Sequence, residues 1–259
     1  PKAAGTAFRK VLQQVYGPQR VLTDTTNMFE DNMPATIDRQ IKVIDGHFRA
    51  GKYEKFFPDA KTITWLRQPI HRLISDYCFR QIGNLKQKEF ISKDRLLEFA
   101  KIPGNRNLMS YCINGRPLNY FYFIGIQEYF EEDLQDLREL MGWQEVKTVY
   151  QNRNPYPEYG QFKKAVLADK QLIAELTALN SQDLQLYQSA WKLRDQRKKG
   201  LISLPLTPPP KGDKEDKGDK GDKGDKGDKE DKGGTGKMPV LREPVPTLGS
   251  IDKVAVSDV

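Results

Sequence analysis

The first residues of the chain have the composition of a loop that binds an anion. The stretch PKAAGT, residues 1–6, places a lysine and small residues ahead of AFRKVLQQVY, in which Phe8, Val11 and Leu12 fall on one helical face. Small residues allow backbone N–H groups to close around an oxyanion, and the N-terminus of the following helix adds a partial positive charge. The sequence therefore predicts an oxyanion-binding loop. The alternative is an ordinary strand-to-helix turn that contains a lysine.

The stretch LRQPIHRLIS carries two groups suited to binding a phosphate. Arg67 ends a predicted strand, and Ser75 lies eight residues later in the helix that Pro69 begins. A guanidinium group offers a planar fork of donors to phosphate, and a serine hydroxyl adds a neutral donor. The alternative is a surface ion pair for Arg67 and a plain helix-face position for Ser75.

The chain has two histidines, and one of them stands where a general base is expected. His47, in DGHF, follows a predicted strand, and a neutral imidazole accepts protons near pH 7. The alternative for His47 is a hydrogen-bonded structural role. His71 is expected to face solvent near the beginning of its helix.

These groups need a scaffold, and the chain alternates strand and helix patterns. Strands are predicted at 20–24, 41–48, 61–67, 119–126 and, leading into a loop, from 148. Helices are predicted after residue 6 and at 69–82, 94–102, 105–114, 129–143, 162–180 and 181–199. This order indicates an α/β fold with a mainly parallel sheet covered by helices on both faces. Because ligands bind at the carboxyl ends of such strands, residues 1–6, His47 and Arg67 are expected to meet at one edge.

The predicted loop lacks the strand that should fix its upstream end. We therefore expect a first strand to be missing and an empty slot in the central sheet with exposed strand edges. The hypothesis that follows is an N-terminally truncated chain or a wrongly assigned start.

The composition changes near residue 204 and predicts one domain, 1–203, followed by a disordered tail, 204–259. The tail is rich in Lys, Gly and Asp, as in KGDKEDKGDKGDKGDKGDKEDKGG, and cannot form a core. A collagen helix is the alternative, but KED interrupts the glycine register that such a helix requires. The final residues, KMPVLREPVPTLGSIDKVAVSDV, are expected to be too short for a core.

Charge and cysteine content restrict the partners and the compartment. The tail has 11 basic and 12 acidic residues, so the net charge of +7 arises in 1–203 and favours anionic partners. Cys78 and Cys112 are expected to be buried free thiols, with a disulfide as the alternative. No apolar run is long enough for a membrane span. A cytoplasmic protein is expected from the chain as given, and membrane association is the alternative if a preceding segment is missing.

Taken together, PKAAGT and LRQPIHRLISDY resemble the sulfotransferases that use 3′-phosphoadenosine-5′-phosphosulfate (PAPS), in particular the carbohydrate branch that includes the heparan and chondroitin enzymes. That family has an early loop close to PKTGGTS and a later LRDPxxRxxSxY. The similarity runs in order from Pro1 to about Leu193 and includes GHF, FIGIQEYFEEDLQDL and LYQSAW. It implies a P-loop-like three-layer fold and sulfuryl transfer from PAPS to a hydroxyl group of a glycan or other carbohydrate.

The resemblance also assigns roles to individual residues. It places the 5′-phosphosulfate against Lys2, Ala4, Gly5, Thr6 and Ala7, and the 3′-phosphate against Arg67 and Ser75. Lys2 would stabilise the bridging oxygen of the leaving phosphate, and His47 would be the catalytic base. Arg72 also matches the pattern, with a structural ion pair as the alternative. This chemistry requires no metal, and no ligand cluster suggests one. The polar segment 84–119, with Asn105, Arg106 and Asn107, is expected to shape the acceptor side.

The chain departs from the family pattern at three positions. Ala3 replaces Thr, Ala7 replaces Ser and Gln68 replaces Asp; the last position is expected to orient the loop. Two lost hydroxyl donors at about 1 kcal/mol each predict roughly one to two orders of magnitude weaker PAPS binding. The main alternative is a truncated, inactive nucleotide-binding module. Nucleic-acid binding lacks a reader motif, and a kinase is disfavoured because Lys2 precedes Gly5.

Overall fold

The computed structural model describes residues 3–30, 32–83, 91–146, 156–203, 205 and 253–258. Its helices are α1 (Gly5–Tyr16), α2 (Pro69–Gly83), α3 (Lys93–Lys101), α4 (Leu108–Ile113), α5 (Phe130–Met141), α6 (Tyr159–Leu167), α7 (Lys170–Leu179) and α8 (Ser181–Lys198). Its strands are β1 (Val21–Asp24), β2 (Val43–Gly46), β3 (Lys61–Leu66), β4 (Phe123–Ile126) and β5 (Val254–Asp258). The strand expected from residue 148 lies outside the described residues.

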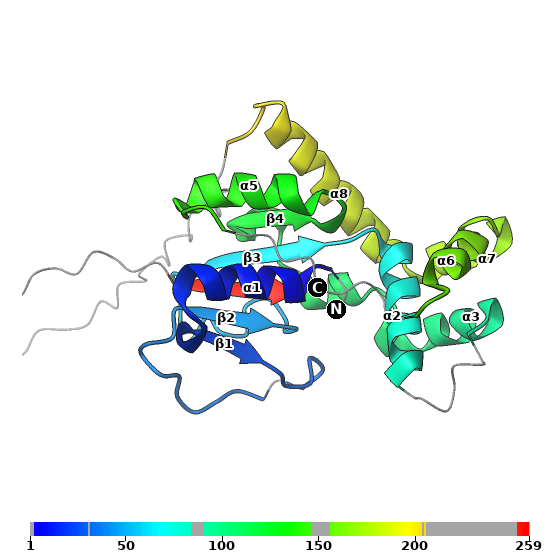
Figure 1. Cartoon of the computed structure of the whole chain (residues 1–259), viewed down its shortest axis with the longest axis horizontal. Coiled ribbons are helices and arrows are strands. Elements are labelled where there is room, and N and C mark those ends of the chain that lie inside the picture. The colour runs from blue at the N-terminus through cyan, green and yellow to red at the C-terminus, as the bar shows by residue number, and fades with distance from the viewer. Residues whose placement is uncertain are drawn as a thin grey trace, which may run out of the picture. The chain divides into compact units, whose positions relative to one another are not determined.

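The strands form one five-stranded parallel sheet with the order β1-β2-β5-β3-β4 (Figure 1). β1 to β4 lie within the ranges predicted from the sequence, which confirms an α/β fold with a parallel sheet flanked by helices. Because all strands are parallel, their carboxyl ends share one edge of the sheet.

Alternate side chains of the strands enter two different apolar cores. On one face, Ile63 and Trp65 of β3 pack with residues of α1 and α5, among them Phe8 and Leu137. On the other face, Leu66 packs with residues of α4 and α8. Neighbouring residues of a strand therefore face opposite cores. Because both faces of the sheet are buried, the strands are nearly continuous apolar runs in the sequence.

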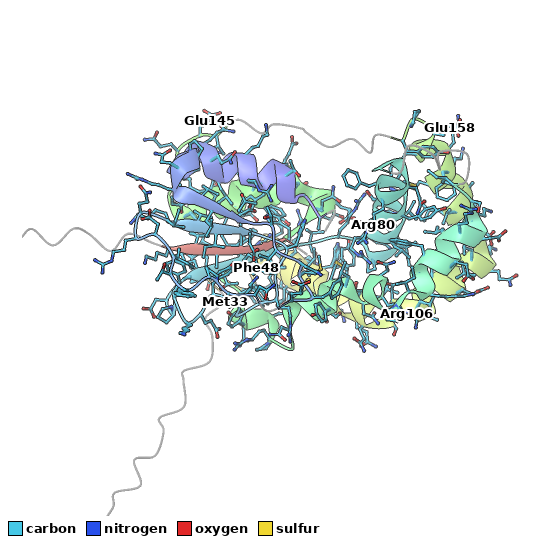
Figure 2. All side chains as sticks on the ribbon, turned by 90° about the horizontal axis from the view of Figure 1, so that it is seen from below. Met33, Phe48, Arg80, Arg106, Glu145 and Glu158 are labelled. Carbon is cyan, nitrogen blue, oxygen red and sulfur yellow. The ribbon has the colours of Figure 1, made fainter. Side chains whose placement is uncertain are left out.

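A separate core joins α2, α3, α6 and α7. Tyr77 of α2 contacts the rings of Phe99 and Phe162, with ring centroids 5.5 and 6.0 Å apart. The single helix expected at 162–180 is two helices, because Asp169 caps a new one: its side chain accepts a hydrogen bond from the Leu172 N–H at 3.1 Å. Figure 2 shows Arg80 and Glu158 in this helical part and Phe48 beside the sheet.

β5 corrects the expectation of a disordered tail at its last residues, 254–258. Val254, Ala255 and Val256 are buried, and the strand pairs with β2 and β3, with Val254 opposite both Val43 and Lys61. This short segment could not form a core alone, but it gains two hydrogen-bonded ladders, and Val254 and Val256 enter the core shared with α1 and α5. We expected an empty slot in the central sheet, but among the described strands β2 and β3 are bridged by β5, which comes from residues far along the chain.

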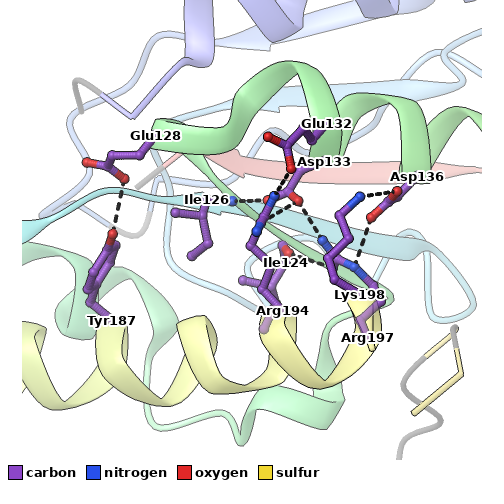
Figure 3. Close-up of polar contacts among 10 residues, drawn as sticks. All are labelled: Ile124, Ile126, Glu128, Glu132, Asp133, Asp136, Tyr187, Arg194, Arg197 and Lys198. Atoms are coloured by element: carbon purple, nitrogen blue, oxygen red, sulfur yellow. Dashed lines mark hydrogen bonds and ion pairs between the residues drawn. The ribbon is translucent and has the colours of Figure 1, made fainter. Parts of the chain in front are cut away.

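Buried ion pairs fix α8 across the end of β4 (Figure 3). The Asp133 carboxylate accepts hydrogen bonds from the Ile126 N–H at 2.8 Å and from the guanidinium groups of Arg194 and Arg197 at 2.7 Å each. Burial raises the pKa of Asp133 against the opposing effect of these donors. The guanidinium of Arg194 also lies 3.8 Å from the ring centroid of Tyr129. This network holds the short segment after β4 in place.

Candidate functional site

The loop expected to hold an anion leads into the first turn of α1. Helix α1 connects to the amino end of β1, so its own beginning lies toward the carboxyl edge of the sheet. Thr6 and Ala7 are in its first turn, and Ala3 is buried. Ala4 precedes the helix with φ 72°, a left-handed conformation that favours glycine. Lys2, the residue given a catalytic role, lies outside the described residues.

His47 directly follows β2 at the same edge. The preceding Gly46 is paired with Asp24 of β1, and a Cβ atom on Gly46 would lie 2.4 Å from the Asp24 carbonyl oxygen. Only glycine allows this close approach. Asp45, fully buried in β2, forms an ion pair with Arg9 of α1. The helix that begins at the loop and the strand that carries His47 are therefore linked directly.

A buried polar cluster lies at the end of β1, next to Gly46. Asp24 accepts hydrogen bonds from Lys52 Nζ, the Tyr53 hydroxyl and both the N–H and hydroxyl of Thr26, at 2.6 to 2.8 Å. Burial opposes ionisation of Asp24, but these donors outweigh it and hold its pKa below the ordinary value. The cluster ties the segment that follows His47 back to β1.

Arg67 directly follows β3, with only β5 between β2 and β3. The strands that carry His47 and Arg67 are therefore two inter-strand spacings, about 10 Å, apart across the sheet. In the register Gly46 is level with Thr64, so β3 extends two residues further than β2 before Arg67. Gln68 positions the beginning of α2: its side-chain oxygen accepts a hydrogen bond from the His71 N–H at 2.7 Å, and its own N–H donates to Glu128 at 3.0 Å. Ser75, in the second turn of α2, is buried.

His71 does not face solvent freely, contrary to our expectation. It is partly buried, and this burial together with the charges of Lys163 and Arg67 lowers its pKa to about 4. Burial and Arg67 likewise lower the pKa of Lys163, against the opposing charge of Glu128. Three basic groups from α2, α6 and the end of β3 thus lie within reach of one another's charge.

A hollow of about 250 Å³ opens beside the segment that follows His47. Its lining comes from Met33, Arg49, Ala50, Gly51, Lys52, Asn114 and Arg116. Arg116 is paired with Glu54 at 2.7 Å, and Arg49 donates to the side-chain oxygen of Asn114. The Arg49 guanidinium also lies 5.3 Å from the ring centroid of the exposed Tyr111. Cations and an amide therefore line the hollow together with Met33 and Ala50, and an aromatic ring packs against one of its cations.

The residues of the segment expected to shape an acceptor side lie in different surroundings: one lines the hollow and the others hold helices together. Asn114 lines the hollow, but Asn105 and Arg106 donate to backbone carbonyls around α3. Asn107 caps α8 by accepting hydrogen bonds from the N–H groups of Gln182 and Asp183, and Asp183 in return accepts from two N–H groups of α4. These three residues therefore hold helices in place.

Arg72 has the structural role that we gave as its alternative. Its side chain is fully buried, donates to the Asn105 carbonyl at 3.1 Å and lies 3.9 Å from the Asp76 carboxylate. Cys78 and Cys112 are buried free thiols, as expected.

Three features were not predicted from the sequence: the ion pair of Arg9 with Asp45, the polar cluster around Asp24 and the position of Lys163. The aspartates at two neighbouring strand ends were a visible signal for the first two. Nothing in the sequence around Lys163 indicates that the Arg67 charge reaches it, because α6 and the end of β3 meet only through the packing of the helices.

Within the described ranges, no group of three or more His, Cys, Asp or Glu side chains is arranged to hold a metal ion. None of the helices in those ranges has the length and apolar content that a membrane crossing requires. A scan of protein-family models, a search of curated proteins and a search of solved structures each found no match.

Proposed function

We propose that this protein is a PAPS-dependent sulfotransferase with a P-loop-like three-layer fold. One observation carries the proposal: the helix that follows the predicted loop, His47 and Arg67 converge on the carboxyl edge of one parallel sheet, where α/β folds bind nucleotides. Each of the three brings the chemistry that a phosphosulfate donor and an attacking hydroxyl group require.

In the proposed reaction, the imidazole of His47 accepts the proton of an acceptor hydroxyl group. The hydroxyl oxygen forms a bond to sulfur in line with the bridging oxygen, and the S–O bond to the leaving phosphate breaks. Adenosine 3′,5′-bisphosphate departs with the electron pair. The N–H groups at the beginning of α1, with Lys2, stabilise the charge that develops on the phosphate, and Arg67 with Ser75 holds the 3′-phosphate.

The hollow beside His47 supports a carbohydrate acceptor. Arg49 and Asn114 line the hollow and offer hydrogen bonds to hydroxyl groups. The exposed ring of Tyr111, which the Arg49 guanidinium contacts, and that of Phe29, with centroids 5.3 Å apart, offer an apolar surface for the face of a sugar outside it. Arg49, two residues after the proposed base, lines this hollow, so we propose that the acceptor binds on the side of the chain that follows His47.

Transfer of radiolabelled sulfate from PAPS to a panel of glycans tests the proposal. We expect product with the parent chain and a rate about 100- to 10,000-fold lower for His47→Gln, which keeps similar volume but removes the base. The affinity for adenosine 3′,5′-bisphosphate should stay within about threefold in that variant. Nucleotide binding without any transfer would instead favour an inactive binding module, and equal turnover in both proteins would remove His47 from the reaction.

A further inference from the structure

Glu128 stands just after β4, at the same edge of the sheet as the candidate site. β3 and β4 are neighbours with Leu66 opposite Ile126, and two residues beyond this pair Glu128 comes beside Gln68. The Glu128 carboxylate accepts a hydrogen bond from the Gln68 N–H at 3.0 Å. The carboxylate therefore joins the end of β4 to the backbone that directly follows Arg67.

The N–H that Glu128 binds belongs to the peptide group between Arg67 and Gln68. A peptide group is planar and stiff, so a hydrogen bond to it restricts the backbone on both of its sides. The other groups of Gln68 are held by α2: its side-chain oxygen accepts from the His71 N–H at 2.7 Å, and its carbonyl oxygen accepts from the Arg72 N–H at 2.9 Å. The backbone that carries Arg67 into the site is thus fixed from β4 and from α2.

The second oxygen of the Glu128 carboxylate is held by α8. It accepts a hydrogen bond from the Tyr187 hydroxyl at 3.4 Å (Figure 3). Burial and the charge of Glu128 raise the pKa of Tyr187, so the hydroxyl keeps its proton and remains a donor at neutral pH. Helix α8 is itself fixed at the end of β4 by the ion pairs of Arg194 and Arg197 with Asp133. Donors on two different elements therefore hold one carboxylate in one orientation.

The charge of Glu128 and its hydrogen bond have opposite effects on a phosphate bound by Arg67. The charge repels the anion, but Glu128 is exposed, so water and salt reduce this repulsion. The hydrogen bond favours binding, because a guanidinium group gives paired hydrogen bonds to phosphate only when its backbone is correctly placed. Removal of the carboxylate therefore raises the affinity if the charge dominates and lowers it if the hydrogen bond dominates.

We propose that Glu128 is a positioning residue that fixes the backbone of Arg67 for the 3′-phosphate of the donor. This inference rests on the proposed function, in which Arg67 binds that phosphate. Glu128 acts through the peptide group between Arg67 and Gln68 and makes no contact with the nucleotide, and Tyr187 holds its carboxylate from α8. Its hydrogen bond outweighs its charge.

Calorimetry with adenosine 3′,5′-bisphosphate and adenosine 5′-phosphate tests this proposal in the parent chain, Glu128→Ala, Glu128→Gln and Glu131→Ala. Glu128→Ala should weaken bisphosphate binding about 5- to 30-fold and leave monophosphate binding within about twofold. Glu128→Gln keeps an oxygen that accepts the Gln68 N–H and should bind the bisphosphate within about threefold of the parent. Glu131→Ala removes an equal charge from an exposed position three residues away and should match the parent.

The outcomes separate this inference from the proposed function. If the parent prefers the bisphosphate and Glu128→Ala keeps or strengthens that preference, or weakens both nucleotides equally, the role of Glu128 is overturned and the proposed function stands. An equal loss in Glu128→Gln and Glu128→Ala also overturns the role. If the parent has no preference for the bisphosphate, the proposed function fails and the inference fails with it.

Circular dichroism shows whether each variant is folded. If Glu128→Ala does not fold, Glu128→Asp decides, because its shorter side chain keeps the charge but draws the carboxylate away from the Gln68 N–H. Glu128→Asp should lose part of the preference for the bisphosphate, and an unchanged preference would overturn the role.

Discussion

Ala4 is the residue at which the backbone of the proposed loop is most strained. Its φ of 72° costs an L-amino acid about 1 kcal/mol or more relative to glycine, although glycine loses more entropy on folding. We expect Ala4→Gly to raise the free energy of unfolding by about 0.5 kcal/mol. Ala7→Gly, inside α1, is the control and should lower it by about 0.5–1 kcal/mol. Urea denaturation measures both, and a destabilised Ala4→Gly would contradict this conformation.

His71 predicts a specific dependence of stability on pH. Its pKa is about 4 in the folded protein, since burial and the charges of Lys163 and Arg67 disfavour the protonated ring, against an ordinary value of 6.5. Between these values the unfolded chain binds a proton that the folded chain does not, so stability falls as pH falls from about 6.5 to 4 and changes no further below that. Because the ring is partly exposed, we expect a loss of about 1 kcal/mol.

Urea denaturation of the parent and His71→Gln near pH 7 and near pH 5 measures this contribution. The parent should lose more stability than the variant on acidification. All other ionisable groups are common to the two proteins, so the difference between their pH dependences isolates His71. Identical pH dependences would show that the ring keeps its ordinary pKa.

At the scale of elements, the beginning of α2 depends on the side chain of Gln68. This residue accepts the hydrogen bond of the His71 N–H, a group that otherwise has no partner within the first turn of the helix. We expect Gln68→Ala to lower the free energy of unfolding by about 1 kcal/mol, and Gln68→Asp to retain or exceed the parent's stability because a carboxylate also favours a helix N-terminus. Thermal denaturation compares the three, and a neutral Gln68→Ala would show that the cap contributes nothing.

At the scale of the whole molecule, β5 completes the sheet between the strands that carry His47 and Arg67. Val256 is fully buried there, so Val256→Asp buries a carboxylate among apolar side chains. We expect it to lower the free energy of unfolding by about 3 kcal/mol or more, or to abolish the cooperative transition. Leu201→Asp, at a side chain that is 70% exposed, should change little. A normal melting curve for Val256→Asp would mean that residues 254–258 do not fill the slot.

The elements that sequence could predict are those with strong local patterns. β3 and β4 were visible as apolar runs, and α1 and α5 showed helical periodicity, because these residues enter cores on fixed faces. β5 was missed because its five residues follow a long low-complexity tract, and pairing with strands about 200 positions earlier leaves no local signal. The influence of the Arg67 charge on Lys163 was missed for the same reason: it arises only through the packing of α6 on α2.

The edge of the sheet that carries the candidate site could be predicted from the order of strands and helices alone. His47 and Arg67 each follow a strand, and parallel strands bring such positions together whatever their distance in sequence. The contacts that hold them, Arg9 with Asp45 and Gln68 with Glu128, depend on side-chain geometry and emerge only from the folded chain.

The central claim is that one nucleotide binds at the edge of the sheet that carries His47 and Arg67. Nuclear magnetic resonance tests it directly, because the chain has only two histidines, one at that edge and one that the charge of Arg67 reaches. The two imidazole signals are followed against pH with and without adenosine 3′,5′-bisphosphate, and His71→Gln assigns them. The ligand should raise the pKa of His71 from about 4, since a phosphate beside Arg67 favours the protonated ring, and should shift the His47 signal. Saturating ligand that leaves both signals unmoved would contradict a shared site at this edge of the sheet.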